Sequence, residues 1–351
     1  MSLAEECGAY DRCMDPADAL DAIAEILETN LEPTFRIKAF RTAADAVRGA
    51  GPEQIAALNT EGKLKDLPGV GDKTALVISQ ALEGRKPDYL ERLEGKQPDI
   101  ASGPGAALRT LLKGDLHLHS DWSDGGSPIE QMAQTAMALG HEYMALTDHS
   151  PRLTVANGLT ADRLRRQLGV LEELNAQLAP FRILRGIEVD ILDDGALDQD
   201  PKLLGELDVV VASVHSKLRM DAPEMTKRMV AALANPHVDI LGHCTGRLVV
   251  GKGRPESTFD EEIVVAAAQR FDKAIEINSR PERLDPPRRI LRLMVDGEVK
   301  TSVDSDAHAP GQLHWQPYGC DRAVEENVDP DLVVNTWSAD DLLAWTASHS
   351  D

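Results

Sequence analysis

Six of the ten histidines stand at or just after the end of short apolar, β-branched runs, and five acidic residues join them there. Neutral imidazoles and carboxylates bind divalent transition metals, and clustered ions of this kind hydrolyse phosphate esters at neutral pH. The sequence therefore predicts a multinuclear Zn, Mn or Fe site for phosphoester hydrolysis. The residues concerned are His117, His119, His149, His215, His243, His308, Asp124, Asp148, Glu188, Asp304 and Asp306.

The other four histidines lie outside this pattern. His141, His237 and His349 stand in helical or turn contexts, where we expect structural or solvated side chains. His314 follows the last of the polar strand ends, and we expect it at the surface rather than at a pocket rim.

Seven runs carry the chemical residues and alternate with amphipathic helical stretches: GDLHLHS, EYMALTDHS, RILRGIEVDI, LDVVVASVHS, VDILGHCTGR, AIEINS and VKTSVDSDAH. Their polar ends stand at 119, 149, 188, 215, 243, 278 and 308. Intervals of about 30 residues suit a strand plus a crossover helix. The sequence therefore predicts an α/β fold, a parallel (βα)7 barrel, with its active site at the carboxyl ends of the strands.

The first part of the chain is expected to form a separate helical domain over residues 1–94. Asp15 followed by Pro16 signals a helix start. The stretch KLKDLPGVGDKTALVISQALEG (63–84) has a helix-hairpin-helix pattern, with Ala75, Ile78 and Leu82 facing inward. Prolines and glycines predict a linker over 95–113, and the barrel is expected over 114–340.

The hairpin offers a way to hold a phosphate backbone. The turn at Gly69, Val70 and Gly71 is expected to leave backbone N–H groups at the start of the next helix, where they can bind a phosphate oxygen without reading bases. Lys73 favours this contact and Asp72 opposes it. We therefore expect weak, salt-sensitive and sequence-independent contact with DNA.

Composition limits the classes of function. With 37 Lys+Arg against 59 Asp+Glu, the net charge of −22 excludes a broadly basic surface that coats nucleic acid. The four cysteines form no CxxC pair, which argues against a disulfide framework and a thiolate zinc knuckle. No signal peptide and no apolar membrane-spanning run is evident, so a cytoplasmic protein without a membrane partner is expected. The oligomeric state is left open.

The motifs GDLHLHSDWSDG, ALTDHS, GIEVDI, ASVHS, GHCTGR, EINSRPERLDPP and SDAH, in this order, resemble the polymerase and histidinol phosphatase (PHP) domain. They are most similar to the version that ends bacterial family X DNA polymerases. The resemblance implies a distorted TIM-like barrel with up to three divalent metals. It implies that His117, His119, Glu188 and Asp306 hold the first metal, that Glu188 bridges to a second completed by His215 with His243 nearby, and that Asp124, His149 and His308 hold the third.

The helical part is similar to the small lyase-type domain that opens the same polymerases, through FRIKAFRTAADAV and LKDLPGVGDKTA. The fingers and palm that separate the two domains in those polymerases have no counterpart here, so nucleotidyl transfer is not expected. Val77 stands where members with lyase activity carry a Schiff-base lysine, and valine cannot form an imine.

Cations near the strand ends are candidates for binding the substrate phosphate. Arg247 is the first candidate, because it follows His243 at a strand end, and Arg152, Lys217 and Arg280 are the others. Asn278 is expected to orient a ligand or a substrate oxygen.

These observations favour a metal-dependent phosphoesterase acting at nucleic-acid ends, most plausibly a 3′→5′ exonuclease or 3′-end-processing enzyme in DNA repair. A small-molecule phosphatase, for histidinol phosphate or a nucleotide monoester, is the alternative, although such an enzyme has no need of a helix-hairpin-helix. A third hypothesis is a non-catalytic DNA-repair adaptor, but the complete set of metal ligands argues against it.

Overall fold

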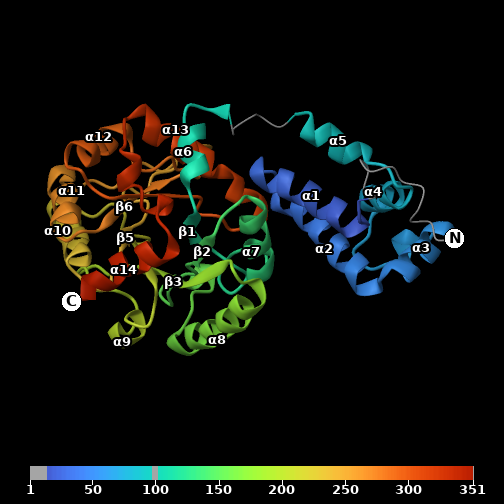
Figure 1. Ribbon diagram of the computed structural model, residues 1–351, viewed down its shortest axis with the longest axis horizontal. Coiled ribbons are helices and arrows are strands. Elements are labelled where there is room, and N and C mark those ends of the chain that lie inside the picture. The colour runs from blue at the N-terminus through green and yellow to red at the C-terminus, as the bar shows by residue number, and fades with distance from the viewer. Residues whose placement is uncertain (1–13, 97–101, 351) are drawn as a thin grey trace. The chain divides into compact units, whose positions relative to one another are not determined.

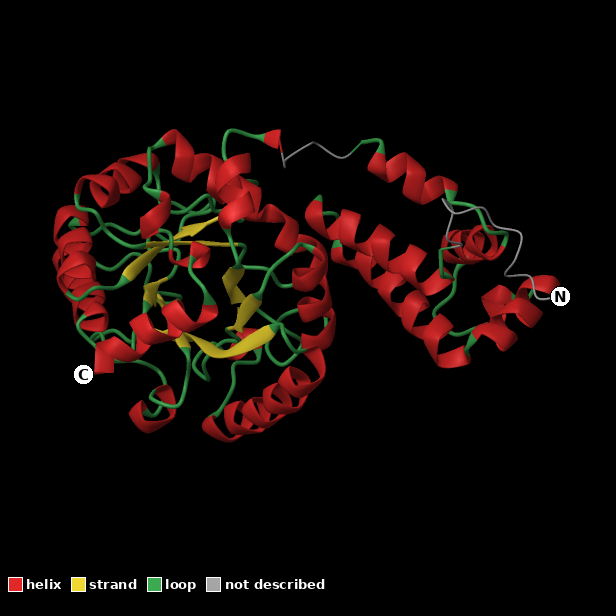
Figure 2. Ribbon diagram, in the orientation of Figure 1, coloured by secondary structure: helices red, strands yellow, loops and turns green. Residues whose placement is uncertain are grey.

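The computed structural model describes residues 14–96 and 102–350, and the chain divides into two compact units, residues 1–98 and 99–351. The first unit consists of helices, and the second is a ring of strands surrounded by helices (Figures 1 and 2). Cys7, Cys13 and part of the expected linker, residues 97–101, lie outside the described residues. No helix of the described parts is long and apolar enough to span a bilayer.

The first unit begins where the sequence predicts. Asp15 accepts a hydrogen bond from the amide of Ala17 (2.8 Å), and Pro16 occupies the first helical position. Leu20, on the first helix, is completely buried, whereas Leu82 is 36% exposed, so its expected inward orientation is wrong. The elements of this unit are α1 (Pro16–Thr29), α2 (Thr34–Ala50), α3 (Pro52–Thr60), the 3-10 turn η1 (Leu64–Asp66), α4 (Asp72–Leu82) and α5 (Asp88–Glu94).

Arginines on α2 are paired with acids of α1 and of the loop before α2. Arg41 contacts Asp21 and Glu28, each at 2.8 Å, and Arg48 also pairs with Asp21. Arg41 is largely buried, and its ion pairs connect the two helices. These pairs leave little positive charge on α2 to bind an external polyanion.

The second unit confirms the predicted barrel. Seven parallel strands follow one another in sequence order around a nearly closed ring. A bridge between Leu118 and Ala307 joins the last strand to the first. Each of the seven predicted runs contains one strand: β1 (Gly114–Leu118), β2 (Tyr143–Leu146), β3 (Arg182–Asp190), β4 (Val209–Ser213), β5 (Ile240–Leu241), β6 (Ala274–Asn278) and β7 (Thr301–Asp304).

Helices cover the outside of the strands and bury their outward apolar residues (Figure 1). Their bounds are α7 (Ile129–Ala138), α8 (Ala161–Leu178), α9 (Pro201–Leu204), α10 (Ala222–Leu233), α11 (Glu261–Arg270), α12 (Arg288–Asp296) and α13 (Gln316–Glu325).

Two helices depart from the expected boundaries of the barrel. Helix α6 (Ala106–Leu111) lies inside the segment expected to be a linker, and Leu108 packs into the barrel core. Helix α14 (Ala339–Ala347) extends past residue 340, and its Leu342 and Trp345 are buried against strand residues. The barrel unit is therefore longer at both ends than the expected range of 114–340.

His141 gives the barrel unit a pH-dependent stability. Burial and the nearby Arg109 lower the pKa of His141 to about 3, so the folded state keeps the ring neutral. Between pH 7 and pH 5 the unfolded chain binds a proton at this histidine and the folded chain does not. This difference removes about 2 kcal/mol from the free energy of unfolding. H141Q lacks this difference in proton binding. We therefore expect its free energy of unfolding to fall by about 2 kcal/mol less than that of the wild type over the same pH range.

Urea unfolding of both proteins at pH 7 and pH 5 measures this difference. All four tryptophans (Trp122, Trp315, Trp337 and Trp345) lie in the barrel unit, so their fluorescence reports its unfolding. The same loss of stability in the wild type and in H141Q would contradict the assignment.

Candidate metal centre and substrate cavity

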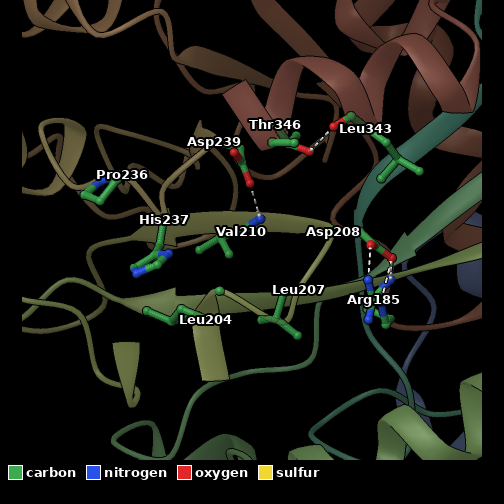
Figure 3. Close-up of a pocket in the computed structure, with 12 residues that line it drawn as sticks. Arg185, Leu204, Leu207, Asp208, Val210, Pro236, His237, Asp239, Leu343 and Thr346 are labelled. Carbon is green, nitrogen blue, oxygen red and sulfur yellow. Dashed lines mark hydrogen bonds and ion pairs between the residues drawn. The ribbon is translucent and has the colours of Figure 1, made fainter. Parts of the chain in front are cut away.

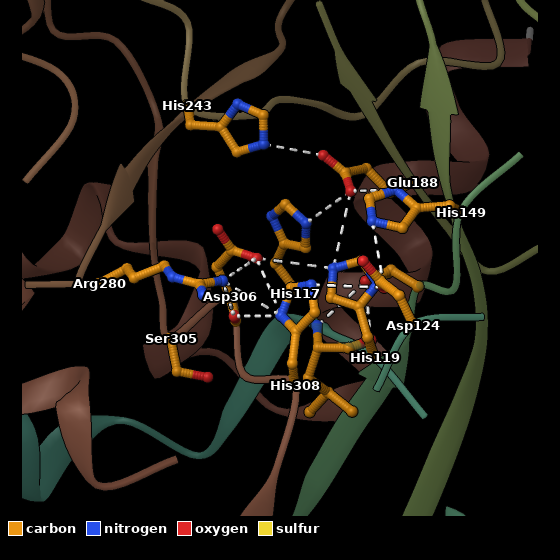
Figure 4. Close-up of polar contacts among 12 residues, drawn as sticks. His117, His119, Asp124, His149, Glu188, His243, Arg280, Ser305, Asp306 and His308 are labelled. Atoms are coloured by element: carbon orange, nitrogen blue, oxygen red, sulfur yellow. Dashed lines mark hydrogen bonds and ion pairs between the residues drawn. The ribbon is translucent and has the colours of Figure 1, made fainter. Parts of the chain in front are cut away.

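The carboxyl ends of the barrel strands bring together all nine side chains that the sequence predicts as metal ligands. Figure 4 labels these residues except for His215. His117 lies in β1 and Glu188 in β3, and the remaining ligands lie in the loops that follow β1, β2, β4, β5 and β7. The complete set is His117, His119, Asp124, His149, Glu188, His215, His243, Asp306 and His308.

Glu188 lies at the centre of this cluster and is almost completely buried. Its Oε2 lies 3.3 Å from His117 Nε2 and 2.8 Å from His149 Nδ1. Its Oε1 lies 3.2 Å from His215 Nε2 and 2.9 Å from His243 Nε2. One carboxylate therefore reaches imidazoles on both sides, as a ligand that bridges two ions must.

Asp306 and Asp124 complete the cluster. His119 Nε2 lies 3.6 Å from both Glu188 Oε2 and Asp306 Oδ1, and Asp124 Oδ1 lies 3.5 Å from His149 and 3.4 Å from His308. Asp306 has a left-handed backbone (φ 53°), which costs energy for a residue other than glycine. Strained backbone of this kind concentrates at functional sites.

Many polar atoms of the cluster have no hydrogen-bond partner although they are buried. They include Nε2 of His117, both ring nitrogens of His119 and of His243, Nδ1 of His149 and both carboxylate oxygens of Glu188. Each such atom costs about 1–3 kcal/mol when nothing satisfies it. Divalent metals satisfy such atoms, and nitrogen and oxygen donors without thiolate suit Zn, Mn or Fe. The residues present therefore fit the predicted metal centre.

The donor atoms fall into four overlapping groups that could each hold an ion. The grouping differs in detail from the sets that the sequence implies, because His119 joins Asp124, His149 and His308, and His243 joins His117 and Glu188. The groups are His119, Asp124, His149 and His308; His117, His119 and Asp306; His117, Glu188 and His243; and His149, Glu188 and His215.

Two further carboxylates orient imidazoles, and the sequence reasoning missed both. Glu276 Oε1 lies 2.7 Å from His117 Nδ1, and Asp190 Oδ1 lies 3.1 Å from His215 Nδ1. A carboxylate on one ring nitrogen turns the other nitrogen toward the metal position and raises its basicity. Alternation along a strand could have indicated them, because residues two apart share a face and Asp190 follows Glu188 by two.

Several protonation states already suit metal binding. Although burial disfavours its charge, His215 and His117 hold the pKa of Glu188 well below its usual range. Burial lowers the pKa of His119 well below its usual range, and burial together with Arg283 lowers that of His243 to about 4. An ionised carboxylate and neutral imidazoles are the forms that coordinate an ion.

His117 and His215 behave differently. Burial acts against their charge, but carboxylates outweigh it, so Glu276 and Glu188 raise the pKa of His117 well above its usual range and Glu188 and Asp190 raise that of His215 to about 9. In the absence of an ion, the two imidazoles therefore hold protons that balance the carboxylates. Ion binding releases such protons.

A cavity of about 530 Å³ opens over the cluster, and three arginines line it: Arg254, Arg280 and Arg283. Arg283 was missed by the sequence reasoning. Its Nε donates to Asp306 Oδ2 (3.0 Å), whereas its buried Nη1 has no hydrogen-bond partner. Arg280, which the sequence predicts, lies in the same cavity, with Nη1 3.3 Å from His308 Nδ1.

The other predicted substrate cations do not line this cavity. Arg247 donates to the carbonyls of Arg283 (3.0 Å) and Leu284, so its guanidinium fixes the loop that carries Arg283. The amine of Lys217 pairs with Asp193 at the surface, and Arg152 Nε lies 3.8 Å from Asp190. In each case local acceptors bind the cation, which the sequence spacing could not reveal.

Asn278 lies within the cluster, where its Nδ2 donates to Asp306 Oδ2 (3.2 Å) and to Glu276 Oε2 (3.3 Å). This contact fits the expected orienting role. Asp148 and Asp304, by contrast, form hydrogen bonds with residues outside the nine clustered ones. Asp148 accepts from Ser120, Ser123 and Gln167. Asp304 accepts from the amide of Leu116 and from Asn335.

The remaining histidines lie away from the cluster. His349 Nδ1 lies 2.7 Å from Asp239 Oδ1, His141 is buried beside Arg109, and His237 and His314 are partly buried. No group of potential metal ligands among the described residues includes any of them.

The hairpin of the helical unit has fewer free amides than expected. Val70 N–H donates to Leu67 O (3.1 Å), and Gly71 N–H donates to Thr74 Oγ1 (2.9 Å). Gly69 has φ 89°, and a Cβ there would lie 2.7 Å from the Thr42 side chain, so the turn requires glycine. The first amides of α4 are therefore the ones left to bind a phosphate.

The two lysines at this hairpin differ in their availability. Lys65 Nζ pairs with Asp72 Oδ1 at 2.8 Å, whereas Lys73 is exposed and forms no ion pair with a described residue. Val77, the position compared with the lyase lysine, is buried in the helical core.

A second cavity lies at the opposite, amino ends of the strands (Figure 3). Its charged groups already have partners: Arg185 forms two hydrogen bonds to Asp208, and Asp239 accepts from the amide of Val210. This end of a parallel barrel serves stability rather than catalysis. The cluster at the carboxyl ends is therefore the better candidate for a functional site.

Comparisons with known proteins agree with this geometry. A PHP-domain model matches residues 115–280, and a helix-hairpin-helix domain model matches residues 14–87. The chain is 41% identical over 234 residues to the DNA polymerase/3′-5′ exonuclease PolX of Bacillus subtilis (strain 168), a match that covers 67% of this chain and 41% of that protein.

Shorter proteins match over most of their length. A probable phosphatase of Thermoanaerobacter sp. (strain X514) is 31% identical over 233 residues, covering 63% of this chain and 89% of the relative. A putative histidinol phosphatase structure from Listeria monocytogenes aligns with TM-score 0.43 and 16% identity, covering 57% of this chain and 97% of that one. From the domain models and the Thermoanaerobacter relative, we conclude that the chain belongs to the PHP family, with a helix-hairpin-helix domain ahead of its PHP domain.

Proposed function

We propose that this protein is a metal-dependent phosphoesterase that hydrolyses phosphodiester bonds at the 3′ ends of nucleic acids, as a 3′→5′ exonuclease or 3′-end-processing enzyme in DNA repair. One observation carries the proposal: buried imidazole and carboxylate atoms without hydrogen-bond partners lie beside a cavity with three arginines, at the carboxyl ends of the barrel strands.

The nine clustered residues would hold two to three divalent ions, Zn, Mn or Fe. When bound, such ions supply a nucleophilic water at neutral pH and neutralise charge on phosphoryl oxygens. Glu276 and Asp190 keep His117 and His215 in the orientation that ligation requires.

The arginines of the cavity bind the phosphoryl group. Arg283 Nη1 is buried and free, and a non-bridging phosphate oxygen satisfies it with a charge-assisted hydrogen bond. Its Nε remains bound to Asp306, which keeps the guanidinium fixed during the reaction. Water adds to phosphorus, and the bond from phosphorus to the 3′-oxygen of the remaining strand breaks. That oxygen takes up a proton, and the terminal nucleotide is released as its 5′-phosphate.

Two features favour a nucleic-acid substrate. The helix-hairpin-helix domain offers sequence-independent phosphate contacts, and the Bacillus subtilis relative is named a DNA polymerase and 3′-5′ exonuclease. This chain spans 41% of the length of that relative.

The probable phosphatases among the relatives favour a second candidate, a small-molecule phosphatase acting on histidinol phosphate or a nucleotide monoester. A non-catalytic DNA-repair adaptor is the third, and it leaves the free Nη1 of Arg283 without a role.

Metal content is the first test of this proposal. Elemental analysis of gently purified protein is expected to find two to three divalent transition-metal ions per chain, and EDTA is expected to abolish hydrolysis. E188Q is expected to reduce activity and metal content more than alanine at any single ligand histidine, because Glu188 contacts imidazoles from several strands. Less than one ion per chain, with activity that survives chelation, would overturn the metal centre.

Substrate preference is the second test. The metal-loaded protein is compared on 3′-labelled single-stranded DNA, 3′-phosphorylated DNA, RNA and p-nitrophenyl phosphate. We expect removal of the 3′ end of DNA with a higher kcat/KM than hydrolysis of the short ester, because only the polymer carries further phosphates that the helix-hairpin-helix domain can bind. A preference for the short ester would support the small-molecule phosphatase, and no hydrolysis at all would support the adaptor.

The hairpin provides the third test. Since Asp72 pairs with Lys65, D72N removes a negative charge and frees that lysine. We expect D72N to tighten DNA binding by about 2- to 5-fold at low salt and to steepen its salt dependence, and K73A to weaken binding by a similar factor. Fluorescence anisotropy with a labelled oligonucleotide measures both effects.

The matched control for D72N is E94Q, which makes the same change of charge and frees Lys86 from an exposed ion pair at the end of α5. We expect E94Q to change binding much less. Equal effects of D72N and E94Q would show that only net charge matters and would remove the hairpin from the proposed binding site.

A further inference from the structure

The cavity over the metal centre has an apolar part that the proposed chemistry does not use. Besides the arginines and ligands, it is lined by Leu153, Leu248 and Val250. Leu153 belongs to the loop after β2, and the other two belong to the loop after β5. Because β3 and β4 separate β2 from β5 in the ring, these side chains reach the cavity from different parts of its mouth.

The apolar residues after β5 stand on a small hairpin, residues 248–254. Leu248 and Arg254 exchange both backbone hydrogen bonds (2.9 Å each), and Gly251 and Gly253 turn the chain with φ of 67° and 65°. The amide of Val249 donates to Glu282 O, which ties the hairpin to the loop that carries Arg280 and Arg283. The hairpin is thus held beside the arginines proposed to bind phosphate.

Charge in this part of the cavity disfavours an amine-bearing substrate group. Each lining carboxylate has a basic neighbour, since Asp124 and Glu188 lie beside imidazoles, Asp306 pairs with Arg283, and Glu282 Oε2 is bound to Arg280 Nε at 3.2 Å. The three arginines of the lining repel an ammonium group such as the amine of histidinol phosphate. An uncharged, flat ring fits this apolar wall instead.

We propose that Leu153 and Val250 form a platform for the nucleobase of the terminal nucleotide, whose 5′-phosphate lies at Arg283. The proposal rests on the proposed phosphoesterase function and names the part of the substrate that the cavity recognises. Aliphatic side chains contact the face of any base, so the platform binds all four bases without reading their edges. It selects a nucleotide over a phosphoester that lacks a base.

Two chromogenic diesters with the same leaving group test the platform. Thymidine 5′-(p-nitrophenyl phosphate) carries a base, and methyl p-nitrophenyl phosphate does not. In both, water adds to phosphorus and the bond to p-nitrophenolate breaks, with one proton released to solvent. We expect the metal-loaded full chain to have at least a tenfold higher kcat/KM on the thymidine ester.

Val250 and Val249 provide a matched pair of variants. Both are about half exposed (54% and 50%), but Val250 lines the cavity and Val249 does not. We expect V250S to raise KM for the thymidine ester by about 3- to 10-fold with little change in kcat, and to leave the methyl ester unchanged. V249S is expected to leave both substrates unchanged, and L153S to behave as V250S does.

Binding measured without turnover gives a second readout. Inhibition by thymidine 5′-phosphate is expected to weaken in V250S by the same factor, whereas inhibition by inorganic phosphate stays constant. Equal effects of V250S and V249S, or equal effects of V250S on the two esters, would overturn the platform. If the wild type hydrolyses both esters equally well, the platform is wrong and the phosphoesterase stands. If it hydrolyses neither, the proposed function itself fails.

Discussion

The burial of one carboxylate, Glu188, is the constraint on which the rest of the barrel depends. An ionised carboxylate cannot be taken out of water unless opposite charge or hydrogen bonds replace its hydration, and here five imidazoles surround it. These imidazoles come from β1, β2, β4 and β5 or the loops after them. The strand ends therefore have to meet at one point, and a closed parallel barrel is a fold that achieves this.

The charged residues around Glu188 stabilise the buried cluster and not the protein surface. Glu276, Asp190 and Asp306 add negative charge around the imidazoles, and Arg283 is buried among them with a raised pKa, because acids led by Asp306 outweigh its burial. Elsewhere many cations are paired locally, as Arg41 is with Asp21 and Glu28. A net charge of −22 thus coexists with three arginines in the lining of the cavity, where a phosphoester needs positive charge.

The order of the strands and the eleven strand-end residues that include the nine clustered ones could be predicted from the sequence, because a strand that turns from apolar to His, Asp or Glu shows both its direction and its end. The choice of the nine came from the resemblance to the PHP domain. The roles of single cations could not. Arg247 and Arg283 stand in similar loops after strands, yet Arg247 binds backbone carbonyls while Arg283 keeps a free nitrogen. That difference depends on how the loops fold over each other, which spacing does not encode. Asp148 also follows a strand, but hydroxyl and amide donors bind it instead.

The seven-stranded ring closes by two different means, and the difference explains how the metal centre is placed. At the carboxyl ends β1 meets the loop that follows β7, since the amide of His119 donates to Ala307 O (2.8 Å) and Leu118 is bridged to Ala307. This contact draws the ligands after β1 and β7 together.

At the amino ends the gap is filled by the segment around Asn335, whose side chain bonds to Gly114 O, Val303 O and Asp304, while Val333 is bridged to Thr301. The inserted segment takes the place of an eighth strand only at that end of the barrel. The strands therefore need to converge only where the imidazoles and carboxylates lie clustered, and the amino ends remain filled by side chains that serve stability.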